Sequence, residues 1–155
     1  MKSPDDGKPE SWHRFFGAGA NNAAWTLVEL PIGDFDKREL LDAAHAAAWH
    51  WHQVGTELQR MRALALLALA HARTGLGPTA MAYADDVRAY FLSRPGTPDW
   101  EVAFTHVTQA FAASAAGDRE SHARSHAAAE QAIAALATDE DRDVVQRVFR
   151  HVPRP

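Results

Sequence analysis

The sequence contains no cysteine among its 155 residues. This absence excludes disulfide bonds, thiolate metal sites and cysteine nucleophiles, and it agrees with a reducing compartment such as the cytoplasm. The first residues, MKSPDDGKPESW, lack the apolar core of a secretory signal, so we expect no export. No run of about 18 apolar residues occurs without charge, so we also expect no membrane partner.

Basic residues are outnumbered by acidic ones. The 16 Lys and Arg residues face 20 Asp and Glu residues, giving a net charge of −4. This balance argues against a nucleic-acid partner, which normally requires a basic face. The length suits one domain with one core. We expect a flexible N-terminal arm over residues 1–10 and a single helical-repeat domain over 11–155.

Alternating strand patterns are missing, β-branched residues are few, and alanine dominates. These features predict an all-α fold. Glycine, proline and capping residues divide the chain into helices expected at about 11–30, 36–54, 57–74, 78–93, 98–116, 118–137 and 139–150. Short loops predict antiparallel hairpins, and the last helix is expected to cap the last pair.

Caps are predicted at the starts of four of these helices. Asp36 would form a capping box with Glu39, and Thr97 would precede Pro98 at the first helical position. Asp118 and Thr138 are the expected N-caps of the last two helices.

Helix pairs recur along the chain, and two segments carry a common pattern of small residues and a turn glycine. In the first, Arg62 to Tyr90, this pattern consists of Leu64, Leu67, Ala68, His71, Gly75, Ala80 and Ala84. The second, Glu101 to Glu130, shows Ala110, Ala113, a Gly-Asp turn at 117–118, Ala123 and Ala127, with one extra residue in its turn. The pattern resembles the tetratricopeptide repeat, and it is similar to small bacterial helical-repeat proteins with no known activity. A generic helical bundle is the alternative.

The resemblance implies a concave groove, lined by the first helix of each pair, that binds a peptide or small ligand. The residues that would line this groove are Asn21, Trp25, Arg62, Leu69, Arg73, Phe104 and Phe111. Aromatic rings would supply buried area, and Arg and Asn would orient the ligand. The leading hypothesis is therefore a non-catalytic binding or adaptor module with a protein or peptide partner, which also forms a homodimer through an uncapped apolar face. The alternative for Leu69, Phe104 and Phe111 is a place in the core.

The stretch AAHAAAWHWHQVG, residues 43–55, gathers three of the nine histidines. On a helix His45 and His52 share one stripe, whereas His50 points away from it. His45 and His52 lie too far apart to chelate one ion alone, so a metal site would need Glu29 or His71 from another helix. Packing on a helix face is the alternative for these histidines, and titration near neutral pH is a further one.

A second histidine pair, His122 and His126, has the spacing of helical metal ligands, with Glu130 one turn later. The glutamate that helical zinc proteases use as a base is missing, and a solvated helix face is the simpler interpretation. No phosphate-binding glycine loop or nucleophile turn occurs. We therefore expect no cofactor and assign no catalytic residue; the alternative is a small helical enzyme or a protein that binds a divalent transition metal through these histidines.

Overall fold

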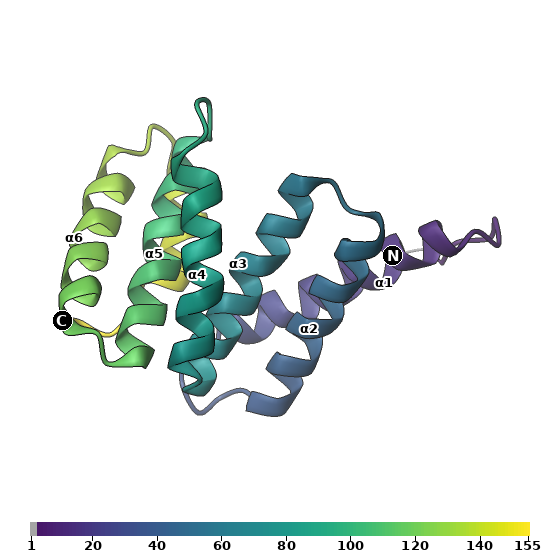
Figure 1. Cartoon of the computed structure of the whole chain (residues 1–155), viewed down its shortest axis with the longest axis horizontal. Helices are drawn as coiled ribbons and strands as arrows, with labels where there is room; N and C mark the ends of the chain where they lie inside the picture. The colour runs from purple at the N-terminus through teal and green to yellow at the C-terminus, as the bar shows by residue number, and fades with distance from the viewer. Residues whose placement is uncertain (1–2) are drawn as a thin grey trace.

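The computed structural model describes residues 3–155, which form seven α-helices and no β-strand (Figure 1). The helices are α1 (Pro9–Val28), α2 (Lys37–Val54), α3 (Glu57–Thr74), α4 (Gly77–Leu92), α5 (Asp99–Ala116), α6 (Arg119–Ala135) and α7 (Asp139–Phe149). Every boundary lies within about two residues of the expected one, so the predicted all-α array is confirmed. Of the expected N-terminal arm, residues 1–2 lie outside the described residues, and Pro9 and Glu10 already belong to α1.

Three of the four predicted N-caps are confirmed by hydrogen bonds to the first turn of their helices. The side chain of Asp36 accepts from two backbone N–H groups, and Asp118 and Thr138 accept from one each. Thr97 differs: its hydroxyl donates to the carbonyl oxygen of Phe91, 2.8 Å away, and therefore closes α4 rather than opening α5. The reciprocal capping box lies at the start of α3, between Thr56 and Gln59.

The helices form two layers. Each helix packs against the next one along the chain, and α1, α3, α5 and α7 also contact one another in that order. The odd-numbered helices therefore form an inner layer, and α2, α4 and α6 cover it from outside. In Figure 1, α1 and the yellow α7 lie on the far side of the array. No helix of the described residues has the length and apolar character needed to cross a membrane.

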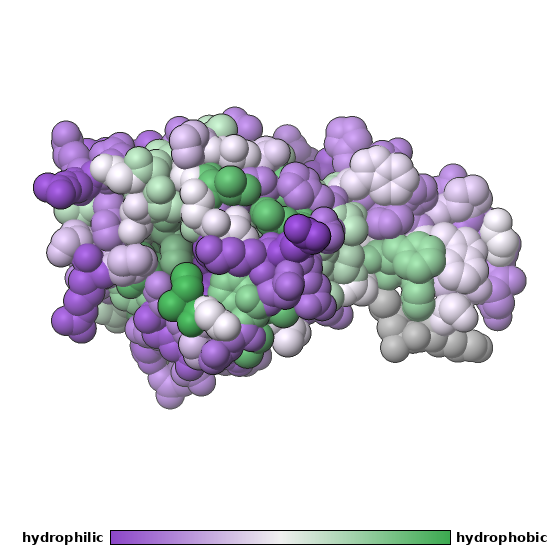
Figure 2. Space-filling model, turned by 90° about the horizontal axis from the view of Figure 1, so that it is seen from below, coloured by the Kyte–Doolittle hydropathy of each residue, from purple (hydrophilic) through white to green (hydrophobic). Residues whose placement is uncertain are grey.

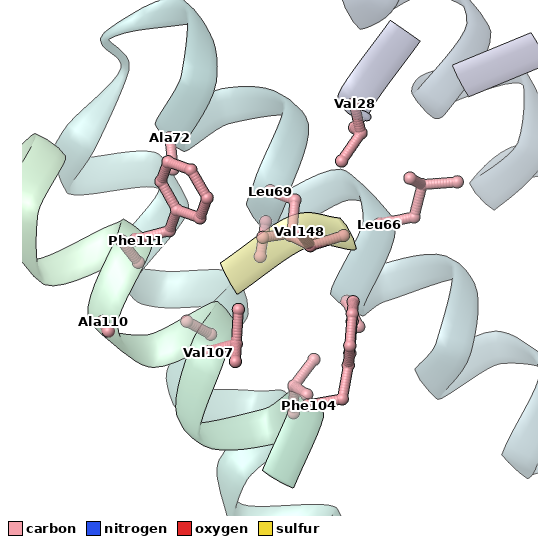
Figure 3. Close-up of a cluster of buried hydrophobic side chains, with 14 of the residues drawn as sticks. Val28, Leu66, Leu69, Ala72, Phe104, Val107, Ala110, Phe111 and Val148 are labelled. Carbon is pink, nitrogen blue, oxygen red and sulfur yellow. The ribbon is translucent and has the colours of Figure 1, made fainter. Parts of the chain in front are cut away.

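The last helix closes the inner layer. Val145 and Val148 of α7 are both 0% exposed, and Val148 lies between Leu69 of α3 and Val107 of α5 (Figure 3). Beyond α7, the His151 ring nitrogen Nε2 lies 2.9 Å from the carbonyl oxygen of Glu29 at the end of α1. The helix thus packs on the last pair, as expected of a cap, and also reaches back to the first pair. It crosses the middle of the inner face and leaves a cavity at each end.

The two segments compared in the sequence, Arg62 to Tyr90 and Glu101 to Glu130, have interhelix turns of equal length, so the extra turn residue that the comparison required is absent. Gly75 and Gly117 both end a first helix with a left-handed backbone (φ 89° and 73°), which glycine adopts without strain. Counted from these glycines, His122 of α6 corresponds to the buried Ala80 of α4. His122 and His126 are both buried on α6, whereas the predicted Ala123 and Ala127 are exposed. The assignment of Ala123 and Ala127 to the packing face was wrong by one residue.

Candidate ligand-binding groove

A cavity of about 360 Å³ lies at one end of α7, between the inner-layer helices. We call it the aromatic groove, because five of its lining side chains are aromatic. Its lining consists of Asn21, Trp25, Glu29, Trp51, Gln59, Arg62, Ala65, Val87, Phe91, Trp100, Glu101, Phe104, Thr105 and Val144. The volume falls in the range of small-molecule sites, about 300–1,000 Å³. Figure 2, seen from below, shows apolar groups in the middle of the body with polar side chains around them.

An ion pair occupies one wall of the aromatic groove. The Arg62 Nε atom donates to the Oε1 atom of Glu101 over 2.6 Å, with Glu101 only 4% exposed and Arg62 47% exposed. The Arg62 guanidinium also lies 5.4 Å from the ring of Trp100. A buried carboxylate requires such a partner, because burial of an unpaired charge is costly. This pairing engages Nε and leaves the two terminal nitrogens of Arg62 at the groove surface.

The aromatic wall comes from helices that the sequence places side by side. Trp100 and Phe104 are four residues apart, so both point to the same side of α5. The Phe104 ring lies 5.4 Å from the ring of Trp25 on α1, at an interplanar angle of 59°. Small residues such as Ala65 of α3 separate these bulky groups and leave the space open. Glu29 completes the rim, its carboxylate 4.0 Å from Arg147 of α7.

The structure divides the seven predicted ligand-binding residues into three groups. Four of them line the aromatic groove: Asn21, Trp25, Arg62 and Phe104. Arg73 and Phe111 line a second cavity, at the other end of α7. Leu69 lies between the two cavities and is 0% exposed beneath Val148.

Of the groove residues that the sequence analysis missed, two could have been identified by their helical spacing. Trp100 and Glu101 lie one turn before Phe104 and Thr105 on the first helix of the third pair. Since positions four residues apart share a helix face, the prediction of Phe104 as a groove residue extends to Trp100. The contribution of Trp51 from α2 and of Val144 from α7 has no comparable signal, because it depends on how the helices pack.

The histidines of residues 43–55 separate into different environments. His45 lies against His71 of α3, with 5.1 Å between ring centroids, while His50 contacts His13 of α1 through Nδ1 atoms 3.0 Å apart. Burial, together with the neighbouring histidine, lowers the pKa of both His45 and His50. His52 is exposed. Of the two residues that a metal site here would need, His71 therefore lies beside His45, whereas Glu29 lies apart at the aromatic groove.

His122 and His126 are buried rather than solvated, at 6% and 8% exposure. The Nε2 atom of His122 lies 2.9 Å from the carbonyl oxygen of Pro153, and the His126 ring lies 4.9 Å from the ring of Phe149. These contacts attach the C-terminal segment to α6. The interpretation of this pair as a solvated face was wrong, because α7 and the residues after it cover that side of α6.

Within residues 3–155, no three His, Asp or Glu side chains converge in a way that could hold a metal ion. His45 instead lies against one neighbouring histidine, His122 lies beside a backbone carbonyl, and Glu29 faces an arginine. Comparisons with protein-family models, with curated proteins and with solved structures find no match. The aromatic groove is therefore the candidate functional site on its geometry alone.

Proposed function

We propose that this chain is a non-catalytic binding or adaptor module of the cytoplasm, with a tetratricopeptide-like array and a peptide or small ligand held in the aromatic groove. The observation that carries the proposal is the combination of an aromatic cavity of about 360 Å³ with the Arg62–Glu101 pair in its wall. The contacts among α1, α3 and α5 support the repeat layout, because each pair contributes its first helix to one inner face.

The chemistry of the groove defines the ligand that it fits. Trp25, Trp100 and Phe104 offer ring faces for an apolar or aromatic group. The terminal nitrogens of Arg62 donate to a carbonyl or carboxylate oxygen beside it, and Glu101 fixes the orientation of the guanidinium in advance. A short peptide that carries one large apolar side chain next to a free backbone carbonyl satisfies both requirements.

Selection from a random peptide library displayed on phage, followed by titration of the selected peptides, tests this proposal. Three groove residues are tryptophans, so bound peptides are expected to change the intrinsic tryptophan fluorescence. Substitution of Arg62→Ala or Trp100→Ala is expected to weaken binding about tenfold or more, the loss typical of a central interface residue.

Two exposed residues outside the groove lining provide matched controls. Trp49→Ala removes an indole that is 57% exposed on α2, and Arg60→Ala removes an exposed arginine of α3. Both control variants are expected to bind the selected peptides as the unmodified chain does. A library that yields no binder, or peptides that bind R62A and W100A with unchanged affinity, would overturn the assignment of the groove.

A further inference from the structure

The second cavity, of about 460 Å³, lies at the far end of α7 from the aromatic groove. We call it the basic cavity. It is lined by the end of α3, the end of α5, the loop between α1 and α2 and the segment after α7. The lining residues are Pro31, Ile32, Ala72, Arg73, Phe111, Ser114, Ala115, Arg150, His151 and Pro153. They include two arginines and a histidine but no carboxylate.

Arg73 is a buried cation without a counter-charge. Its side chain is only 4% exposed, one terminal nitrogen donates to the carbonyl oxygen of Leu30, and the buried Nε atom has no hydrogen-bond partner. The guanidinium lies 4.8 Å from the ring of Phe35 and 5.7 Å from that of Phe111. No carboxylate of residues 3–155 lies within 4.0 Å of it. Since an unpaired buried charge is costly, an anion in the cavity would compensate Arg73.

Two more basic groups converge on the same space from the C-terminal segment. The Nε2 atom of His151 lies 2.9 Å from the carbonyl oxygen of Glu29, and a terminal nitrogen of Arg150 lies 3.4 Å from the same oxygen. Burial lowers the pKa of His151, and the positive charges of Arg73 and Arg150 lower it further, while the backbone carbonyl and the carboxylate of Glu29 act in the opposite direction. The nearest acidic group in this environment, the Glu29 carboxylate, lines the aromatic groove and faces Arg147.

We propose that the basic cavity binds a small organic anion, with its oxyanion on Arg73 and Arg150 and its apolar body against Ile32, Phe111 and Pro153. Arginine suits this role because its planar guanidinium donates two parallel hydrogen bonds to a carboxylate or phosphate. The apolar walls and the volume favour an anion with a hydrocarbon part over inorganic phosphate. This site is separate from the aromatic groove, because α7 lies between them.

Titrations with benzoate, phenyl phosphate and inorganic phosphate at constant ionic strength test the proposal. The first two probes distinguish a carboxylate from a phosphate ester, and the third measures what the oxyanion alone contributes. We expect saturable binding of at least one organic probe, seen by calorimetry and as a rise in the unfolding temperature. The imidazole NMR signals of His151, assigned with H151Q, are expected to shift during the titration.

Arg150→Gln is the informative variant, because Arg150 is exposed and its loss leaves the core intact. We expect it to weaken binding about tenfold, as removal of one charge-assisted hydrogen bond does. Arg124→Gln on α6 changes the net charge equally, pairs only with Glu120 and Ser121, and should leave binding unchanged. Ile32→Gln should weaken the organic probes but not inorganic phosphate.

Three results would overturn the proposal. The first is the absence of saturable binding by both organic probes. The second is an equal effect of R150Q and R124Q, which would indicate general charge screening rather than a site. The third is binding of inorganic phosphate as tight as that of the organic probes. Because none of these measurements uses the aromatic groove, a failure here leaves the proposed function standing, and the reverse also holds.

Discussion

Truncation of Val148 to alanine tests the position of α7, on which both cavities depend. Val148 is 0% exposed between α3 and α5. Loss of two buried methyl groups, at about 0.8 kcal/mol each plus the cost of the space left behind, lowers the free energy of unfolding by about 2–3 kcal/mol. Alanine is the better helix former by about 0.5 kcal/mol, which leaves a net loss of about 2 kcal/mol.

Val144→Ala is the matched control on the same helix. Val144 is 41% exposed at the edge of the aromatic groove, so its truncation removes little buried area. The gain in helix propensity is the same in both variants and cancels in their difference. We expect V144A to change the free energy of unfolding by no more than about 0.5 kcal/mol.

Urea denaturation followed by circular dichroism measures both variants, and the slope of the unfolding free energy against urea shows whether the transition stays two-state. Val145 is the other valine of α7 that is 0% exposed, so Val145→Ala should lower the free energy of unfolding as V148A does. Equal losses for V148A and V144A would refute the reasoning, because they would mean that α7 is not docked on the inner layer through Val148.

Three further predictions follow from other contacts. Gly77→Ala should lower the free energy of unfolding by about 1–3 kcal/mol in urea, because the added Cβ would overlap the backbone carbonyl of Ala115; a neutral result would contradict the close approach of α4 and α5. In a double-mutant cycle, Arg62 and Glu101 should couple by about 1–2 kcal/mol, against less than about 0.5 kcal/mol for the exposed pair Arg94 and Glu57; equal coupling would contradict the burial of Glu101. Stability should fall as the pH drops below about 6.5, because burial lowers the pKa of His45, His50, His106 and His151 in the folded state below the ordinary histidine value of 6.5. Urea unfolding at pH 7.5 and 5.5 measures this loss, which H106Q should reduce, and equal stability at the two pH values would contradict it.

The sign of this pH effect follows from linkage. A histidine whose pKa is lower in the folded state binds fewer protons there than in the unfolded state. Lowering the pH therefore stabilises the unfolded state relative to the folded one. Stabilisation is complete above the unfolded-state value of 6.5 and is lost as the pH falls through the lower folded-state value. The carboxylates with a lowered pKa, such as Asp36, have an ordinary pKa of 3.8. Their contribution to stability is therefore lost only in more acidic solution.

The helices and their ends could be predicted because their causes are local. An aspartate at an N-cap or a glycine after the last turn acts through the backbone of its own helix, as Asp36 and Gly75 do. The inner layer could also be predicted from the sequence. Trp25, Arg62 and Phe104 were assigned to it by applying one helical register to each helix pair. The error at Ala123 and Ala127 arose because alanine was assumed to mark the packing face. In α6 two histidines occupy the corresponding buried positions instead, and a backbone carbonyl from the C-terminal segment lies within hydrogen-bond distance of one of them.

The division of the inner face into two cavities by α7 could not be predicted from the sequence. An apolar helix face indicates that the helix is buried, but not which part of the protein it packs against. The valines of α7 indicate that the helix is buried on one side. This pattern is equally compatible with a cap over the outer end of the last pair and with the observed position. Its placement is decided by contacts between residues far apart in sequence, such as Val148 with Leu69 and His151 with Glu29. Those contacts remove Leu69 from the predicted groove and separate Arg62 from Arg73. They convert one expected binding surface into two cavities of different chemistry, one aromatic with a paired arginine and one basic with an unpaired arginine.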